Sequence, residues 1–407
     1  MTESFVHIDR PYLLVTNIPY FTDAAGDVFL EKLWHHDLVR HTTYLPRLLL
    51  AAPALPKPPN GDWVRVEEPV RSAIRFVPLP AQPSFKDAVL ALPRTFAGLF
   101  GAVGSADIVH IGVAGWPIPL GWIAGLLAKM RGRRLVVLVE SAPWRLSGGS
   151  QPSRKARVRG TLNEFVARFV CRNADLGFFT HPLYLKSLHG NGRGPAYVTP
   201  ATWIDDENVL ERERAIAIWR KKREGSPRFL FAGRMHPDKG VLVLLEALRI
   251  LDERGVGVHL DFIGTGSLTE QVDAAIARFQ HVRAERLTPV AYGTPFFELL
   301  DGYHALVVPS LADEQPRLVF DAPARAVPLI AANTDGIRPH VEPERTGVLV
   351  ERGDAPALAD ALARLSANPN RLETMGLAAL EEARSHTHTA MHVTRSQLLA
   401  RHLARSR

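Results

Sequence analysis

Residues 228–264 read RFLFAGRMHPDKGVLVLLEALRILDERGVGVHLDFIG, and this stretch decides the fold. It opens with an apolar run at 228–233, passes through a polar turn, continues with helical spacing over 239–255 and closes with a second apolar run at 258–264. A strand, a helix and another strand in this order form a parallel pair with the helix packed on one face. The stretch therefore predicts one βαβ unit of an α/β protein.

The same alternation of short apolar runs and helical patterns extends through most of the chain. The runs that predict strands lie at 12–16, 47–52, 74–79, 107–112, 134–140, 176–181, 228–233, 258–264, 304–310, 327–332 and 346–351. Their apolar residues are continuous rather than alternating, which is typical of strands covered on both faces. We therefore predict doubly wound parallel sheets with helices on both sides.

Two domains are expected from a chain of 407 residues. The strand–helix alternation pauses at 190–227, which places the boundary near residue 200 and predicts domains at 1–200 and 201–387. A last helix at 388–407 follows another helix without an intervening strand, and we expect it to pack back on the first domain. Ligands of such folds bind at the carboxyl ends of the strands, so we expect a site in a cleft between the domains.

Composition favours a soluble globular protein of a reducing compartment. The apolar fraction is 46% and the charged fraction 22%, and no run approaches the roughly 20 apolar residues that cross a bilayer. The amino-terminal segment lacks the pattern of a signal peptide, so we expect a cytoplasmic protein. The single cysteine, Cys171, lies in a helical pattern and reads as a small core residue.

The net charge of +7 raises the question of nucleic acid as a partner. The basic residues are spread along the chain without interleaved stacking aromatics, so we expect no nucleic-acid partner. A mildly positive surface also suits a diphosphate ligand or an anionic lipid surface, and a peripheral contact with the inner membrane face remains compatible with it.

The first candidate site is FLFAGRMHPDKG at 229–240. The apolar strand ends at Gly233, and the cations Arg234 and Lys239 follow before a helix that begins near Gly240. A helix amino terminus offers free N–H groups and positive potential, and two cations beside it form an anion site. An ordinary pair of basic side chains on a surface turn is the equally weighted alternative.

The second candidate site is PSLADEQPRLVFDAPARA at 309–326. Asp313 and Glu314 occupy the loop after a strand, and Asp321 lies in an apolar helix where a carboxylate needs a partner. A ribose diol would serve. In the alternative interpretation Asp313 is a helix cap and Asp321 pairs with a structural arginine.

Together these segments resemble glycosyltransferase family 4 of the GT-B fold. The resemblance covers residues 226–385 through the order GR…KG, DFIGTGSL, VVPSLADEQPRLVFDAPARAVPLIAANTDGIRPHV and TGVLVERGDAPALADAL. The first half matches more weakly, through ADIVHIG and ADLGFFTHPLYLKSLHG. The resemblance implies a retaining transferase, hexosyltransferase-like, that uses a nucleoside-diphosphate sugar as substrate and needs no cofactor.

The family's functional residues carry over onto matching positions. Arg234 and Lys239 correspond to the pair that holds the donor diphosphate, while Asp313 and Asp321 stand where relatives usually have two glutamates eight positions apart. The resemblance implies that Asp313 faces the donor sugar and Asp321 the ribose. The other donor contacts that it implies are Gly26, Gly233, Gly264, Gly266, Glu314, Arg317 and Leu318.

The sequence departs from the family pattern in three places. Glu314–Arg317 replace glycines that give backbone N–H groups to the donor, and Pro316 has no such group. Pro323 lies inside the same predicted helix, which must therefore start late or kink. Glu140 stands where the family has a histidine and is either an acceptor contact or structural, and His110 fits a packed histidine better than an acceptor-side catalyst.

No Asp-x-Asp dyad of the kind that holds a metal–diphosphate complex was found, and no Cys/His cluster has metal-ligand spacing. We therefore expect metal-independent transfer to a saccharide, lipid-linked or small-molecule acceptor, in polysaccharide or glycolipid synthesis. Two alternatives stay open: a sugar-nucleotide epimerase on the same scaffold, and a non-catalytic nucleotide-sugar binding protein.

Overall fold

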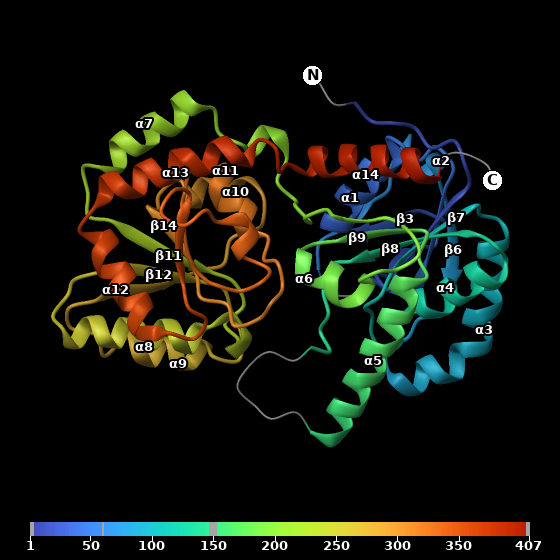
Figure 1. Cartoon of the computed structure of the whole chain (residues 1–407), viewed down its shortest axis with the longest axis horizontal. Coiled ribbons are helices and arrows are strands. Elements are labelled where there is room, and N and C mark those ends of the chain that lie inside the picture. Colours follow the sequence, from blue (N-terminus) through green and yellow to red (C-terminus); the bar gives the residue numbers. More distant parts are fainter. Residues whose placement is uncertain (1–3, 59–60, 146–152, 404–407) are drawn as a thin grey trace. The chain divides into compact units, whose positions relative to one another are not determined.

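The computed structural model describes residues 4–58, 61–145 and 153–403. These divide into two compact units (Figure 1). The described part of the first unit comprises residues 4–58, 61–145, 153–199 and 389–403, and the second unit comprises residues 200–388. Within these ranges no helix combines the length and apolar character needed to cross a bilayer.

The first unit is built on a ten-stranded sheet in the order β10-β9-β8-β7-β1-β4-β2-β3-β5, with β6 paired to β4. Its strands are β1 Tyr12–Val15, β2 Tyr20–Thr22, β3 Val28–Glu31, β4 Leu48–Leu55, β5 Trp63–Arg65, β6 Ile74–Leu79, β7 Ile108–Gly112, β8 Arg134–Val139, β9 Leu176–Phe179 and β10 Ala196–Val198. The six predicted strands of this half form, and all pair in parallel. The prediction missed β2, β3, β5 and β10, and β2–β3 and β3–β5 pair antiparallel, so this sheet is not wholly parallel.

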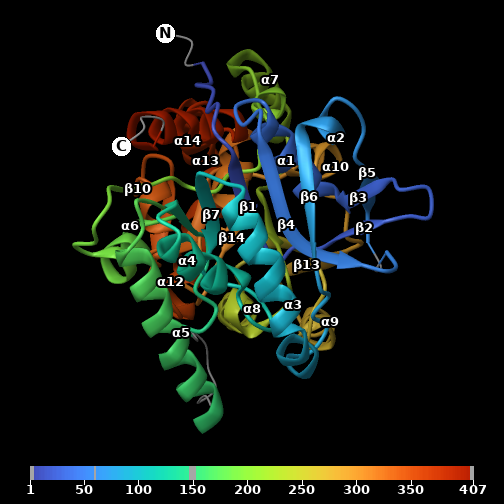
Figure 2. The ribbon, with the colours of Figure 1, turned by 90° about the vertical axis from the view of Figure 1, so that its right-hand side faces the viewer.

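Helices cover both faces of this sheet, because successive strand residues point to opposite sides. Leu13 and Val15 contact one core and Tyr12 and Leu14 the other. Figures 1 and 2 show α3, α4 and α5 on one face and α1 and α14 on the other. The helices are α1 Lys32–Thr42, α2 Val70–Ala73, α3 Phe85–Gly104, α4 Leu120–Met130, α5 Arg154–Arg172, α6 Pro182–Tyr184, a π-helical turn at Leu185–His189, and α14 His388–Leu403.

The last helix, α14, completes the core of the first unit, although residues 200–388 separate it in sequence from the rest of that unit. Leu399 and Leu403 are buried in the cluster that contains Tyr12 and Leu50. The Ser396 hydroxyl accepts a hydrogen bond from the Val6 backbone N–H at 3.1 Å. Apolar burial therefore holds α14 against the first sheet.

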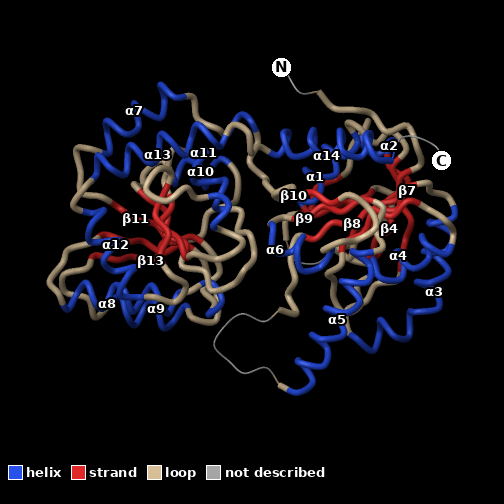
Figure 3. Tube along the Cα trace, viewed as in Figure 1, coloured by secondary structure: helices blue, strands red, loops and turns tan. Residues whose placement is uncertain are grey.

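The second unit has a six-stranded, wholly parallel sheet in the order β13-β12-β11-β14-β15-β16 (Figure 3). Its strands are β11 Arg228–Ala232, β12 His259–Ile263, β13 Arg283–Leu287, β14 Ala305–Val308, β15 Leu329–Ala332 and β16 Gly347–Val350. Its helices are α7 Arg212–Lys222, α8 Val241–Glu253, α9 Thr269–Ile276, α10 Thr294–Leu300, α11 Leu318–Ala324, α12 Ala355–Ser366 and α13 Pro369–Ala383, with short 3-10 turns at Asp206–Asn208, Pro237–Lys239 and Arg338–His340. All five strands predicted for this half are present, and only β13 was missed.

Gly240 brings two loops of the second unit together. Its φ is 72°, a left-handed conformation at the start of α8, and a Cβ atom there would lie 1.8 Å from the Pro309 carbonyl oxygen. The Leu311 backbone N–H donates to the Asp238 carbonyl at 2.8 Å across the same junction. The loop after β11 therefore rests against the end of β14 because residue 240 has no side chain.

Gly240→Ala is expected to lower the free energy of unfolding of the second unit by about 2–5 kcal/mol, because it combines left-handed strain with overpacking. Thermal and urea unfolding followed by circular dichroism measure the change. Gly225→Ala is the matched control, because a Cβ there meets no atom within 4 Å. Equal stability of the two variants would contradict this account of the junction.

Candidate functional site

A pocket of about 450 Å³ opens in the second unit at the carboxyl ends of β11, β12 and β14. Loops that follow parallel strands meet at this edge, which is where α/β sheets bind ligands. The lining residues are Phe231, Ala232, Gly233, Arg234, Lys239, Ile263, Gly264, Pro289, Val290, Tyr292, Phe296, Val307, Val308, Pro309, Ser310, Pro316, Arg317, Leu318 and Asp321. Seven residues predicted from the sequence therefore line one cavity: Gly233, Arg234, Lys239, Gly264, Arg317, Leu318 and Asp321.

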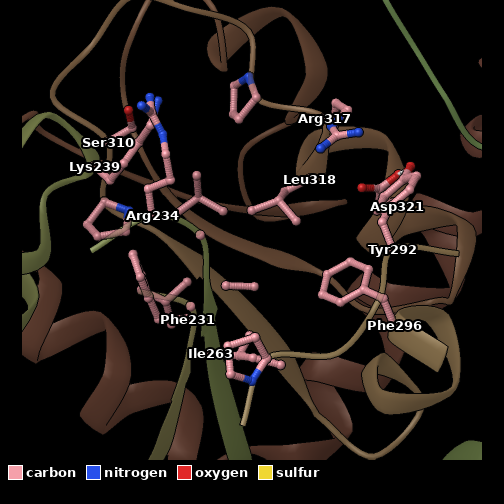
Figure 4. Close-up of a pocket in the computed structure, with 18 of the residues that line it drawn as sticks. Phe231, Arg234, Lys239, Ile263, Tyr292, Phe296, Ser310, Arg317, Leu318 and Asp321 are labelled. Atoms are coloured by element: carbon pink, nitrogen blue, oxygen red, sulfur yellow. Dashed lines mark hydrogen bonds between the residues drawn. The ribbon is translucent and has the colours of Figure 1, made fainter. Parts of the chain in front are cut away.

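Figure 4 shows Arg234, Lys239 and Ser310 at one end of the pocket and Arg317, Tyr292 and Asp321 at the other. Arg234 follows β11 with its side chain 72% exposed, and its nearest acidic atom, Asp238 Oδ2, is 3.9 Å away. Lys239 ends the 3-10 turn before α8, and its Nζ lies 3.3 Å from Asp238 Oδ2 and 3.4 Å from Glu314 Oε2. These distances are longer than those of strong charge-assisted hydrogen bonds, so both cations are loosely engaged.

Asp238 contacts both His236 and Lys239 at this end of the pocket. His236 Nδ1 lies 2.6 Å from Asp238 Oδ1. Burial alone would raise the pKa of Asp238, but the hydrogen bond from His236 and the charge of Lys239 outweigh it and hold that pKa below its usual value. The carboxylate is therefore ionised at neutral pH and keeps Lys239 beside the pocket.

Asp321 is the buried acid at the opposite end, on α11. Its side chain is 1% exposed, and its Oδ1 accepts a hydrogen bond from the Tyr292 hydroxyl at 3.0 Å. Its Oδ2 has no hydrogen-bond partner among the residues that the structure describes. Burial raises the pKa of Asp321 to about 7, against the hydrogen bond from Tyr292 and the charge of Arg317. A buried polar atom without a partner points to a ligand group that supplies one.

Tyr292 is a site residue that the sequence reasoning missed. It lies in the loop between β13 and α10, and the guanidinium of Arg317 lies over its ring at 4.5 Å from the centroid. The loop went unnoticed because β13 reads RAERL, a charged edge strand without an apolar run. Ser310, after β14, was likewise not singled out, although it lines the pocket.

Asp313 and Glu314 do not line the pocket as it stands. Asp313 Oδ1 lies 2.9 Å from an Arg352 nitrogen, which makes it part of an ion pair rather than a helix cap. Glu314 Oε2 lies 3.4 Å from Nζ of the pocket residue Lys239. Of the two aspartates eight positions apart, only Asp321 faces the cavity directly, and it contacts Tyr292 instead of a structural arginine.

The two prolines act on the helix as the sequence indicated. The loop continues through Pro316, and α11 begins only at Leu318 and ends at Ala324, one residue after Pro323. Gly264 has a φ of 136°, and a Cβ there would lie 1.9 Å from the Gly233 carbonyl oxygen. Gly266 lies outside the pocket lining, where a Cβ would approach the Met235 carbonyl oxygen to 2.3 Å.

The remaining predicted residues belong to the first unit. Gly26 lies in the turn between β2 and β3 with a φ of 88°, and Glu140 follows β8 with an exposed side chain. His110 is buried on β7 with its Nδ1 2.8 Å from the Tyr12 hydroxyl, and burial holds its pKa well below the usual range. A neutral, packed ring agrees with the structural interpretation of His110. Cys171 is buried in the core, as expected.

Asp321→Asn is expected to be more stable than the wild type at pH 8 and similar to it near pH 4. The pKa of Asp321 is raised from 3.8 to about 7, so between these values the folded state holds a proton that the unfolded state has lost. Stability then falls by about 1.4 kcal/mol for each pH unit over this window. Melting temperatures of both proteins across pH 4 to 8 test this, and a pH-independent difference would contradict it.

The comparisons with known proteins agree with this geometry. The sequence model of the family "Glycosyl transferases group 1" matches residues 226–368, which include all the pocket residues. D-inositol 3-phosphate glycosyltransferase 1 of Catenulispora acidiphila is 28% identical over 329 residues, which are 75% of each chain. The amylovoran biosynthesis glycosyltransferase AmsK of Erwinia amylovora is 31% identical over 177 residues, covering 42% of this chain and 43% of that one.

Solved structures share the fold of the whole chain. Sucrose-phosphate synthase from Thermosynechococcus elongatus superimposes with a TM-score of 0.71 at 18% identity, covering 98% of this chain and 100% of that one. HepE of Anabaena, solved in complex with UDP-glucose, gives a TM-score of 0.64 at 15% identity over 96% of this chain and 99% of that one.

Residues 226–368 thus match the glycosyl transferases group 1 family, and the chain is a glycosyltransferase of the GT-B fold that resembles glycosyltransferase family 4.

Proposed function

We propose that the protein is a retaining glycosyltransferase that takes a sugar from a nucleoside-diphosphate donor bound in the pocket of the second unit. One observation carries the proposal: two cations at one end of a 450 Å³ cavity face a buried carboxyl group with an unpartnered oxygen at the other end. A nucleoside diphosphate has the matching ends, a dianionic diphosphate and a ribose diol.

The diphosphate is assigned to Arg234 and Lys239. Arg234 is largely exposed and can fork onto two phosphate oxygens, while Lys239 acts as a point charge. The contacts of Lys239 to Asp238 and Glu314 are long, at 3.3 and 3.4 Å, so shorter bonds to phosphate can compete with them. The amino terminus of α8 lies directly after Lys239 and adds positive potential.

The ribose is assigned to Asp321. Its free Oδ2 can accept a hydrogen bond from one hydroxyl of the diol, and the Tyr292 hydroxyl fixes the other carboxyl oxygen. The chain shortens the usual glutamate to aspartate, and burial within α11 fixes where that shorter side chain ends. The apolar residues between the two ends, Phe231, Ile263 and Leu318 among them, exclude water from the bound donor.

The reaction breaks the bond between the anomeric carbon and the diphosphate oxygen. Negative charge then develops on the departing diphosphate, where Arg234 and Lys239 are placed to stabilise it. The acceptor hydroxyl attacks from the same face of the sugar and gives its proton to the leaving phosphate, so no strong protein base is required. Asp313 is proposed to contact the donor sugar through Oδ2, since Oδ1 is paired with Arg352.

The acceptor is assigned to the first unit, with Glu140 as a proposed contact, and it is a saccharide, a lipid-linked sugar or a small molecule. Two relatives' names bear on the biological setting. One is an amylovoran biosynthesis enzyme and another a capsular polysaccharide biosynthesis enzyme, so we propose a role in polysaccharide or glycolipid synthesis.

Arg234→Ala and Lys239→Ala should each lower kcat by about 10²–10³, the usual effect of removing a group that stabilises transition-state charge. A thermal-shift screen of UDP-, GDP- and ADP-sugars first identifies the donor, because ligand binding to the native state raises its melting temperature. Release of the nucleoside diphosphate then measures turnover. Near-normal activity of both variants would refute the assignment.

Arg254→Ala is the matched control for these two variants. Arg254 follows α8 in the same unit and pairs on the surface with Asp360 at 2.6 Å. Its removal should leave turnover and donor-induced thermal shift unchanged. A donor that binds tightly without nucleotide release under any acceptor would favour a binding protein, and epimerised sugar formed from donor alone would favour an epimerase.

The product should keep the anomeric configuration of the donor sugar, and the reaction should proceed at full rate in excess EDTA. Retention follows from attack of the acceptor hydroxyl on the face of the sugar that the diphosphate leaves. Metal independence follows from stabilisation of the leaving diphosphate by Arg234 and Lys239. Proton NMR of the first product formed reads the configuration directly. An inverted product would overturn the retaining mechanism, and loss of turnover in EDTA with recovery on adding Mg²⁺ would overturn metal independence.

A further inference from the structure

We propose that helices α3, α4 and α5 of the first unit form a docking surface for an anionic lipid bilayer. The inference concerns a face of the first unit and does not depend on the chemistry assigned to the second. It rests on exposed apolar side chains that recur at helical spacing on α3 and α5, and on the basic side chains that border them.

Helix α5 carries an exposed apolar stripe. Val158, Leu162, Phe165 and Phe169 are 64%, 55%, 70% and 57% exposed. Their spacing of three or four residues places them on one face of the helix. Single exposed apolar residues are ordinary on protein surfaces, but an aligned row that includes two phenylalanines marks an interaction site.

Helix α3 repeats the arrangement on the same side of the sheet. Phe85, Val89, Phe96 and Phe100 are exposed at helical spacing. Figures 1 and 2 place α3, α4 and α5 on one side of the first unit. The three helices also enclose a hollow of about 820 Å³, whose apolar lining includes Phe96, Leu126 and Phe169. Exposed apolar side chains of α3, α4 and α5 thus surround one hollow, whose volume is large enough for part of an acyl chain.

The border of this surface is strongly basic. Helix α5 carries six basic residues against one acid, Glu164, and all six are exposed: Arg154, Lys155, Arg157, Arg159, Arg168 and Arg172. Arg154 and Arg172 lie on the same row as the apolar stripe, one at each end. Glu164 is already paired with Arg145 at 2.6 Å. Arg131, after α4, lies over the Phe100 ring at 3.6 Å, so cation and apolar surface adjoin there too.

This combination fits an anionic bilayer better than a second copy of the chain. An amphipathic surface with phenylalanine and leucine on one stripe and arginine and lysine beside it lies in the lipid interface, with apolar groups below the headgroups. Each basic side chain near an anionic leaflet adds attraction. Two copies placed face to face through α5 would instead bring arginines of like charge together.

The test is co-sedimentation of the full chain with vesicles of phosphatidylcholine alone and of phosphatidylcholine mixed equally with phosphatidylglycerol, at low and high salt. We expect binding to the anionic vesicles that weakens at high salt. Leu162→Ser/Phe165→Ser should weaken it at least about tenfold, from lost apolar burial. Arg154→Gln/Arg157→Gln should weaken it about twenty-fivefold, or about fivefold for each charge.

Matched controls lie on the second unit. Leu242→Ser, on α8 with 47% exposure, and Arg220→Gln/Lys221→Gln, on α7, should bind vesicles as the wild type does. Circular dichroism and melting temperature establish that all variants are folded. Binding unchanged by both α5 double variants would overturn the proposal. So would a wild-type dimer that Leu162→Ser/Phe165→Ser converts to a monomer without any vesicle binding, since that result assigns the face to a second copy.

Discussion

The parallel pairing of β11 with β12 and β14 is the constraint on which the site depends. Parallel strands end at the same edge, so loops that are distant in sequence emerge side by side. The close approach at Gly240 then fixes the loop carrying Lys239 against the end of β14. The chemistry of the pocket is thus a consequence of hydrogen-bond register in the sheet and of one position without a side chain.

The two ends of the pocket differ in how their charged groups are solvated. The Arg234 side chain is largely exposed, so water solvates its charge in the absence of a bound anion. Asp321 is buried, and its raised pKa expresses the free energy needed to hold an anion there. Tyr292 supplies part of the compensation through one hydrogen bond and leaves the rest to whatever occupies the cavity. Because the cationic end is exposed and the acidic end is buried, a ligand with one anionic end and one hydroxyl-bearing end can bind in only one orientation.

Much of this arrangement follows from local sequence, and the rest depends on contacts that local sequence does not encode. Continuous apolar runs predicted eleven strands correctly, because strands buried on both faces admit few polar residues. The missed strands are short or charged edge elements. In RAERL the exposed Arg283 and Glu285 interrupt the apolar run, although Ala284 and Leu287 pack against the cores. Tyr292 and the pairing of Asp313 with Arg352 escaped for a related reason, since each requires knowing which loops meet.

The first unit is discontinuous in the chain, because it needs α14 after residues 200–388 have formed a different unit. During synthesis from the amino terminus, the ribosome releases the whole of the second unit before it delivers Leu399 and Leu403 to the first sheet. Until then the face that holds Ile8, Tyr12 and Leu50 is covered by α1 but not by α14. Closing the first core therefore requires residues that are made after the entire second unit, so part of its apolar face stays uncovered until the last helix is made.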